Sequence, residues 1–341
     1  MRSLRRACAA AVAAGAIVAV TAAEPRVEVL QSTGGLPAHL AGVFLQPLAF
    51  ARAADGTSFV FDSRAHAVFR IDAGGSTARK IVDIGLEEGR LLEPSAFDLE
   101  PGGSFAVADG PNRRERVQIF NAEGRRLGGF TLPGQNAARL TIGSLVLNGV
   151  GSLDYTGSAI LISQPETGAL FTEYTLSGRA YRTFGRLRPT GHEDDRDLHL
   201  ALNVGMPLAI SGGGFYFVFL SGVPMFQKYS QDGRLLYSRH IEGPELDPML
   251  RAMPTTWPRR SVQPGGELPL VPPYVRTAAV DPGGGLWVAL VLPYTYVYDA
   301  SGEKVRTVQL RGSDVFAPTS LFFDGGGRLL ATPGCYEFTV R

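Results

Sequence analysis

The chain has 341 residues, of which 42 are Gly and 23 are Pro, while 45% are apolar and 19% are charged. Gly and Pro interrupt helices, so this composition excludes a helical bundle, and the ordinary apolar fraction excludes an intrinsically disordered chain. The formal net charge of +1 gives no electrostatic reason to expect a nucleic acid partner. The fold class that remains consists of many short strands joined by Gly turns.

The first element in chain order is an expected secretory signal peptide over residues 1–23. Its basic start contains Arg2, Arg5 and Arg6, and an apolar run rich in Ala and Val follows. The alternative is an uncleaved membrane anchor, which needs about 20 strongly apolar residues, more than this run supplies. We therefore expect a secreted or periplasmic protein without a membrane span after cleavage. Cys335 would then be its single cysteine, buried in a C-terminal strand.

The remaining chain, residues 24–341, repeats one unit and is expected to form a single domain. Each unit has an apolar strand, a Gly turn, a second strand, a polar loop, a third strand, a Gly turn and a fourth strand. In the first unit these strands are expected at residues 48–53, 57–62, 67–72 and 77–84. The units start at Pro47, Pro94, Ser144, Pro207, Pro273 and Pro318. Four strands in every 40–50 residues or so predict an all-β propeller, and the six starts predict six four-stranded antiparallel blades. Seven blades are the alternative, but no seventh start is found.

The last unit ends after three strands, so another segment must complete its sheet. The strand Arg26–Gln31 is expected to supply the outermost strand of this last blade. Joining the two ends of the chain in one sheet closes the ring and removes an exposed sheet edge. We expect the closed ring to be a monomer.

The second unit carries a family resemblance. It reads Pro94-Ser95-Ala96-Phe97, then Gly102-Gly103, the strand Phe105–Asp109, and Arg116-Val117. This pattern resembles the NHL-type repeat of six-bladed propellers. The resemblance implies the fold and leaves the activity open, since such propellers include lyases, lactonase-like hydrolases and non-catalytic interaction domains. The lactonase-like members place carboxylates and an Asn at the tops of the inner strands, for which this chain offers Glu93, Asn148, Asp154 and Asn203.

The long connections are expected on one face of the ring. They are Leu86–Glu93, Pro133–Gly143, Arg186–Met206 and Gly243–Pro272. Long loops on a rigid scaffold commonly carry function, so this face is the expected binding face. The Pro-rich loop Gly243–Pro272 is expected to fold across the channel mouth as a lid or to dock a partner, and the alternative is that it only covers the top of its own blade.

A ring of polar residues is expected at the mouth of the channel, where it would bind an anionic or sugar-like ligand. Its members come from loops on the same face: Gln46, Arg64, His66, Glu93, Asp109, Arg113, Arg114, Glu166 and Tyr294. The alternative interpretation is ordinary loop polarity, with Asp109 capping its own turn.

The segment 190–202 is the densest polar stretch, and it offers weak metal candidates in His192, Asp194, Asp195 and His199. Imidazole and carboxylate ligands suit a divalent cation such as calcium or zinc. The segment lacks the spacing of an EF-hand or of a zinc protease, so a solvated loop is the alternative. No nucleophile elbow and no CxxC motif occurs in the chain.

The sequence therefore predicts an exported six-bladed propeller that acts as a non-catalytic binding module through its loop-bearing face. Its partner would be another protein or a small polar ligand at the channel mouth. Two alternatives stay open: a metal-assisted hydrolase or lyase similar to the propeller lactonases, and a scaffold of the cell envelope.

Overall fold

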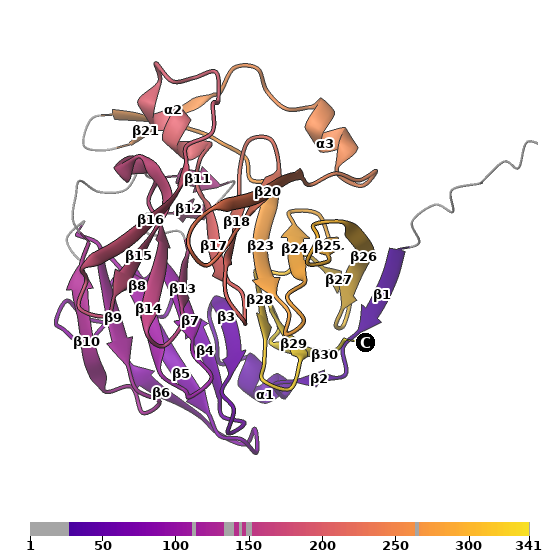
Figure 1. Ribbon diagram of the computed structural model, residues 1–341. Helices are drawn as coiled ribbons and strands as arrows, with labels where there is room; N and C mark the ends of the chain where they lie inside the picture. The colour runs from indigo at the N-terminus through magenta and orange to yellow at the C-terminus, as the bar shows by residue number, and fades with distance from the viewer. Residues whose placement is uncertain are drawn as a thin grey trace, which may run out of the picture.

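The computed structural model describes residues 27–110, 114–132, 140–142, 145–147, 152–262 and 266–340. In this part of the chain, six four-stranded antiparallel sheets surround a central axis (Figure 1). The structure therefore confirms the six-bladed β-propeller that the repeat predicts. The expected signal peptide lies outside the described residues.

The blades follow one another along the chain, each running from its innermost to its outermost strand. Blade 1 is β3 (Pro47–Arg52), β4 (Ser58–Asp62), β5 (Ala67–Ile71) and β6 (Ala78–Val82). Blade 2 is β7 (Ala96–Leu99), β8 (Phe105–Asp109), β9 (Arg116–Phe120) and β10 (Arg126–Thr131). Blade 3 is β13 (Leu153–Tyr155), β14 (Ala159–Ser163), β15 (Ala169–Thr175) and β16 (Ala180–Arg186). Blade 4 is β17 (Gly205–Ala209), β18 (Phe215–Phe219), β19 (Met225–Tyr229) and β20 (Leu235–His240). Blade 5 contains β23 (Val275–Val280), β24 (Leu286–Leu290), β25 (Thr295–Tyr298) and β26 (Lys304–Arg311). Blade 6 is β28 (Ser320–Phe323), β29 (Arg328–Thr332), β30 (Tyr336–Thr339) and β2 (Gly34–Gly35).

The geometry of the hairpin turns explains why the positions of Gly in the sequence predict where the strands begin and end. In the outer turn of blade 1, the Asp72 carboxylate accepts hydrogen bonds from the amides of Ser76 (3.0 Å) and Thr77 (2.7 Å). In blade 5, Asp299 accepts in the same way from the amide of Glu303 at 3.1 Å. An Asp that caps its own turn, followed by a Gly, fixes a tight hairpin locally. The strand positions are therefore encoded turn by turn.

Aromatic side chains fill the spaces between neighbouring blades. Phe61 and Phe97 stack between blades 1 and 2, with ring centroids 5.6 Å apart. Phe226 of blade 4 meets Tyr298 of blade 5 at 4.8 Å. Every residue of the second strands β4, β8, β18 and β24 is buried, because these strands have a sheet against each face.

The third blade begins later than its expected start at Ser144. Residues Leu145–Leu147 form β12, which pairs with β11 (Leu140–Ile142) in a separate hairpin. The innermost strand of the blade is β13, which begins at Leu153. The expected start is therefore wrong, because an apolar stretch in an inserted hairpin has the same pattern as an apolar strand of a blade.

The ring closes through the N-terminal segment, as expected, but with different residues. Gly34–Gly35 forms β2 and pairs antiparallel with β30 in blade 6. The expected closing strand Arg26–Gln31 instead forms β1 (Val27–Gln31), which pairs parallel with β26 at the edge of blade 5. A side chain does not fit in the closing position, because a Cβ added at Gly35 would lie 2.3 Å from the carbonyl oxygen of Cys335. Glycine also tolerates the φ of +133° found at Gly35.

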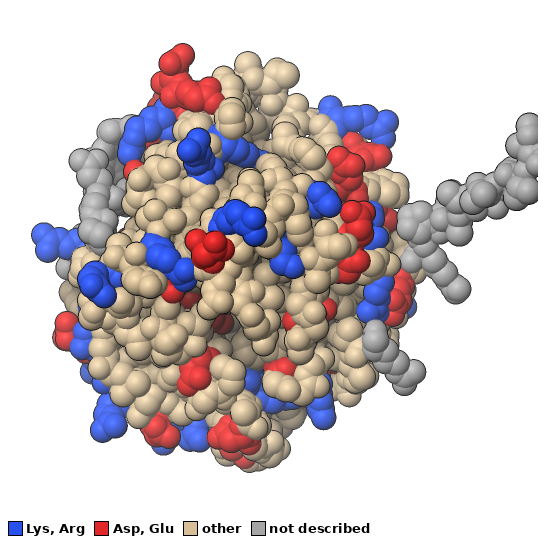
Figure 2. All heavy atoms as spheres, viewed as in Figure 1, with Lys and Arg blue, Asp and Glu red and all other residues tan. Residues whose placement is uncertain are grey.

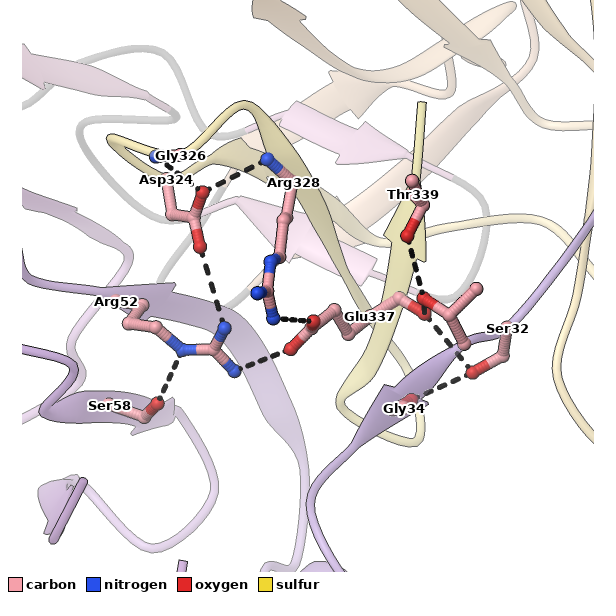
Figure 3. Close-up of polar contacts among 10 residues, drawn as sticks. Ser32, Gly34, Arg52, Ser58, Asp324, Gly326, Arg328, Glu337 and Thr339 are labelled. Atoms are coloured by element: carbon pink, nitrogen blue, oxygen red, sulfur yellow. Dashed lines mark hydrogen bonds and ion pairs between the residues drawn. The ribbon is translucent and has the colours of Figure 1, made fainter. Parts of the chain in front are cut away.

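An ion-pair network joins blade 1 to blade 6 beside this closure (Figure 3). The Arg52 guanidinium on β3 lies 2.7 Å from the Glu337 carboxylate on β30 and 3.4 Å from that of Asp324. Arg328 contacts the other oxygen of Glu337 at 2.5 Å. Residues from the two ends of the ring therefore form a shared network in which Arg52, Asp324 and Glu337 are largely removed from water and Arg328 is exposed.

One face of the ring, called the loop face here, carries the long connections of the described residues, as expected; most of the expected connection Pro133–Gly143 lies outside the described residues. All six inner strands start at this face, because each blade runs outward with strands of alternating direction. The inserted elements of these connections are α2 (Arg196–Ala201), α3 (Asp247–Arg251), and the hairpin of β21 (Arg259–Val262) and β22 (Gly266–Pro269). In Figure 1 they lie together at the upper edge of the ring. The connection into blade 1 contains α1 (Ala38–Ala41), and β27 (Val315–Phe316) pairs antiparallel with the end of β26.

None of the helices in the described part of the chain is long and apolar enough to cross a membrane.

Candidate functional site

A cavity of about 1190 Å³ lies on the axis of the ring. All six inner strands line it, because each contacts the inner strands of the two neighbouring blades. Gln46, Leu220 and Val291 line the end at the loop face, whereas Pro101 and Pro282 line the opposite end. The walls are mainly apolar, with Leu48, Phe97, Leu208, Val280 and Phe322 among them. A large apolar cavity with few polar groups is typical of a small-molecule site.

Two carboxylates, Asp98 and Asp154, interrupt the apolar wall on neighbouring blades. Asp98 lies on β7 of blade 2, and its Oδ2 accepts a hydrogen bond of 2.7 Å from the backbone amide of Tyr155. Asp154 lies on β13 of blade 3, and its Oδ2 accepts from the amide of Ala209 at 3.0 Å. Each Asp therefore binds the inner strand of the next blade. The amide that Asp98 binds belongs to Tyr155, the residue next to Asp154, so this bond brings the two carboxylates close to each other.

The environment of this pair disfavours negative charge. Burial, followed by the neighbouring charge of Asp154, raises the pKa of Asp98 well above its ordinary value. Burial also raises the pKa of Asp154 to about 6, although the bond from the Ala209 amide acts in the opposite direction. Shifted carboxyl groups inside a cavity are typical of functional sites, because burying them lowers the stability of the fold.

The remaining charged groups of the cavity have partners of their own. Asp281 accepts hydrogen bonds from the Gly285 amide and the indole of Trp287, and Asp324 pairs with Arg52. Arg276 is the basic residue of the lining within the described residues; it is exposed and donates to the carbonyl oxygen of Ala317 at 3.2 Å. It lies on blade 5, across the ring from blade 2.

Of the nine residues predicted to form a polar ring, Gln46 is the one that the structure places in the cavity lining among those described. Arg64, Glu93 and Arg114 are exposed on the loop face, and Arg113 lies outside the described residues. Glu166 and Tyr294 are half-buried in the corresponding loops of blades 3 and 5. The ring as a ligand site stays a prediction.

Two residues of the predicted ring, Asp109 and His66, are notable, the first for its structural bonds and the second for its backbone geometry. Asp109 is 2% exposed, and its carboxylate contacts the Arg116 guanidinium at 2.8 Å and the Leu92 amide at 3.0 Å. It therefore fastens the loop that enters its own blade. His66 has a left-handed φ of +49°, and its Nδ1 is buried without a hydrogen-bond partner. We have no physical account of this unpaired nitrogen.

The weak metal candidates do not converge on one point. His192 accepts from the Trp257 indole at 3.3 Å, His199 contacts the Thr190 hydroxyl at 2.8 Å, and Asp195 caps α2 and pairs with Arg259. Asp194 is exposed. Within the described residues, no group of three or more His, Cys, Asp and Glu side chains is placed to hold a metal ion.

The long loops are fixed to the ring rather than folded into the cavity. Arg188 donates to the backbone carbonyls of Leu202, Ser221 and Val223 and stacks on Phe219 at 4.2 Å. Leu246, together with residues of α3 and the turn after it, packs against the cores of blades 4 and 5. No described residue of Gly243–Pro272 lines the cavity. This arrangement favours covering the tops of the blades over a lid across the channel mouth, and docking of a partner stays a prediction.

The surface in Figure 2 shows acidic and basic side chains interspersed over the visible face, without a large area of one sign. The arrangement agrees with the net charge of +1. A charged groove for a nucleic acid backbone is not apparent on this face.

No family model and no curated protein matches the chain. Its fold is similar to a solved protein of unknown function from Bacteroides caccae, with a TM-score of 0.47 and 13% identity over 76% of this chain and 80% of that one. It is also similar to a streptogramin B lyase, with a TM-score of 0.49 and 10% identity over 85% and 91% of the two chains. A third similar structure is virginiamycin B lyase from Staphylococcus aureus, with a TM-score of 0.49 and 11% identity over 87% and 85%. We draw no functional argument from similarity at this level, and membership of the NHL-type repeats stays a prediction.

Proposed function

We propose that the protein is a ligand-binding propeller that takes a small organic molecule into its axial cavity through the loop face. The observation that carries this proposal is the cavity itself: about 1190 Å³, mainly apolar, with a pair of acidic groups on one wall. Ligand sites of this kind enclose most of the ligand and use a few polar groups to orient it. The cavity favours a small ligand over a protein partner, because a folded protein cannot enter it.

A substitution that fills the cavity tests this proposal. Ala49 is half-buried on β3 and lines the cavity, so Ala49→Trp places an indole in the ligand's space. Ala180 is exposed on the outer strand β16, and Ala180→Trp is the matched control.

The purified protein would be screened against a library of small molecules by thermal denaturation. We expect some compounds to raise the melting temperature of the wild type and of Ala180→Trp but not of Ala49→Trp. Native mass spectrometry of the three proteins would then count the bound molecules. If every stabilising compound acts equally on both Trp variants, the cavity is not the binding site.

The site of action is part of the proposal. We infer that residues 1–23 direct the protein out of the cytoplasm, because they combine a basic start with an apolar run that ends in small residues. N-terminal sequencing of the protein recovered from its native cell tests this inference. A mature chain beginning near residue 24 would support export, and an intact Met1 in the cytoplasmic fraction would contradict it.

A further inference from the structure

Two half-buried carboxylates of the axial cavity, Asp98 and Asp154, have fewer polar partners than the buried carboxylates of the described residues. Asp62 is fully buried, but its side chain accepts hydrogen bonds from the amides of Leu45, Gln46, Arg64 and Ala65. Asp109 pairs with Arg116, and Glu337 pairs with two arginines. Buried carboxylates normally have such partners because an isolated one is costly to remove from water.

Asp98 and Asp154 lack an equivalent partner. Each accepts one hydrogen bond from the neighbouring blade, and no Lys, Arg or His of the described residues forms an ion pair with either. Both nevertheless face a space large enough for a ligand. A cation that balances the negative charge of this pair would therefore have to lie in the cavity.

We infer that the cavity binds an organic monocation, with its ammonium group against the carboxyl groups of Asp98 and Asp154 and its carbon skeleton against the apolar walls. This inference rests on the proposed function and specifies the class of ligand. An ammonium group donates several charge-assisted hydrogen bonds, which are the strong ones in a dry site. The Leu48, Leu208 and Phe322 side chains of the wall suit an alkyl or aryl body.

The charge of the pair matches one positive charge rather than two. The pKa of Asp98 is raised well above its ordinary value and that of Asp154 is raised to about 6. Asp154, with a pKa of about 6, is mainly ionised at pH 7, and the raised pKa of Asp98 means that a second negative charge beside it is disfavoured. Asp154 therefore supplies charge, and the Asp98 side chain adds a second oxygen that can accept a hydrogen bond.

The charged groups on the neighbouring elements do not change this balance. On β3, Arg52 is engaged with Asp324 and Glu337, and on β8, Asp109 is engaged with Arg116. The strands β14 and β17 carry no charged residue, and Tyr155 is the other ionisable residue on β13. Across the cavity, Asp281 is bonded to Trp287, and Arg276 remains as a cation at the wall of blade 5.

Two probes with the same skeleton test the inference: 4-phenylbutylamine, which is cationic at pH 7.5, and the neutral 4-phenylbutanol. Their affinities for the full chain would be measured by isothermal titration calorimetry. We expect the amine to bind about ten- to a hundredfold more tightly than the alcohol, which is the typical contribution of a hydrogen bond to a charged group. The affinity of the amine should fall about tenfold between pH 7.5 and pH 5, as Asp154 becomes protonated.

The variants Asp98→Asn and Asp154→Asn keep an oxygen that can accept the neighbouring amide, so the blades stay joined. We expect Asp154→Asn to weaken amine binding about tenfold or more and to change alcohol binding less than twofold. Glu123 is exposed in a turn on the opposite face, so Glu123→Gln removes the same charge away from the cavity and should leave both affinities unchanged. If the Asn variants fail to fold, the inference is tested on the wild type alone, by the affinities of the amine and the alcohol and by the pH dependence of amine binding.

The outcomes separate this inference from the proposed function. If the alcohol binds as tightly as the amine, and Ala49→Trp abolishes both, the cavity binds ligands but the inference is overturned. If neither probe binds and the library screen finds no cavity ligand, the proposed function fails. A titration with calcium chloride provides the third arm: stoichiometric calcium binding that excludes the amine would identify a metal site and overturn the inference.

Discussion

Replacing Asp154 by Asn should stabilise the protein at neutral pH. Asp154 is half-buried in the wall of the cavity and, within the described residues, its carboxyl has no cationic partner, so its ionised form is disfavoured in the folded protein. Asn has the same shape and no charge, and its side-chain oxygen can still accept from the Ala209 amide. The substitution therefore removes an unfavourable charge while leaving the packing of β13 against β17 intact.

The size of the effect follows from the pKa shift. The pKa of Asp154 is about 6 in the folded protein, against 3.8 for an unperturbed Asp. A difference of about two pH units corresponds to about 3 kcal/mol of free energy of unfolding. Because the pKa is raised on folding, this contribution favours the fold below about pH 4 and is lost as the pH rises through 6.

The measurement is the free energy of unfolding in urea, for the wild type and Asp154→Asn, at half-unit steps from pH 4 to pH 8. The difference between the two proteins isolates Asp154 and its effect on the neighbouring Asp98, because the remaining carboxylates contribute equally to both. We expect this difference to grow in favour of the variant by about 3 kcal/mol over that range, or about 5 °C in melting temperature at the upper end.

Glu123→Gln is again the matched control and should show no such trend. A constant difference between the wild type and Asp154→Asn across the pH range would refute the reasoning, because it would mean that Asp154 titrates alike in the folded and unfolded chains. If the free energy of unfolding of Asp154→Asn falls further below that of the wild type as the pH rises, the ionised Asp154 carboxylate has a favourable partner.

Further substitutions test the closure of the ring and the loop face. Arg52→Met should lower the free energy of unfolding by about 3 kcal/mol, because Asp324 and Glu337 lose their shared partner, whereas Met at the exposed Arg79 should change it by less than about 0.5 kcal/mol in urea titrations. Gly35→Ala should destabilise by more than about 2 kcal/mol, since its Cβ would meet the Cys335 carbonyl, and Gly75→Ala, with open space around it, by about 1 kcal/mol. Arg188→Lys should increase hydrogen exchange in residues 188–203, because a single ammonium group cannot bond the carbonyls of Leu202, Ser221 and Val223 together; unchanged protection there would contradict the role given to Arg188.

The blades could be predicted from the sequence because their signals are local. The turn at Asp72 is fixed by side-chain and backbone bonds within six residues, and its Gly is visible in the chain. Alternating apolar strands between such turns then define each sheet. Ring closure is different, because it depends on which distant edge a strand meets. Val27–Gln31 has the pattern of a strand but reaches blade 5, and the closing pair Gly34–Gly35 has no strand pattern at all.

The candidate site was predicted less well than the fold. A polar loop residue such as Asp109 has the sequence pattern of a ligand-binding residue. In the structure, however, its carboxylate already binds the Arg116 guanidinium and a backbone amide. The sequence pattern does not single out Asp98, and it offers Asp154 only as a carboxylate for a lactonase-like metal site. Both break an apolar strand, in Ala96-Phe97-Asp98-Leu99 and Leu153-Asp154-Tyr155. This break was the available signal, but its meaning depends on which side chains of an inner strand face the axis.

The position of the pair also explains how the fold tolerates it. A charged residue between two blades would separate the aromatic contacts that join them, such as Phe61 with Phe97. On the axis, the same residue borders the cavity, so its cost comes from desolvation and from the repulsion within the pair, and the packing of the blades is unchanged. Arg52 joins the ends of the ring through Glu337 and through Asp324, which also lines the cavity. The propeller can therefore keep a carboxylate pair without a cationic partner at its centre. A ligand that neutralises the pair would bind the folded protein selectively and so raise its free energy of unfolding.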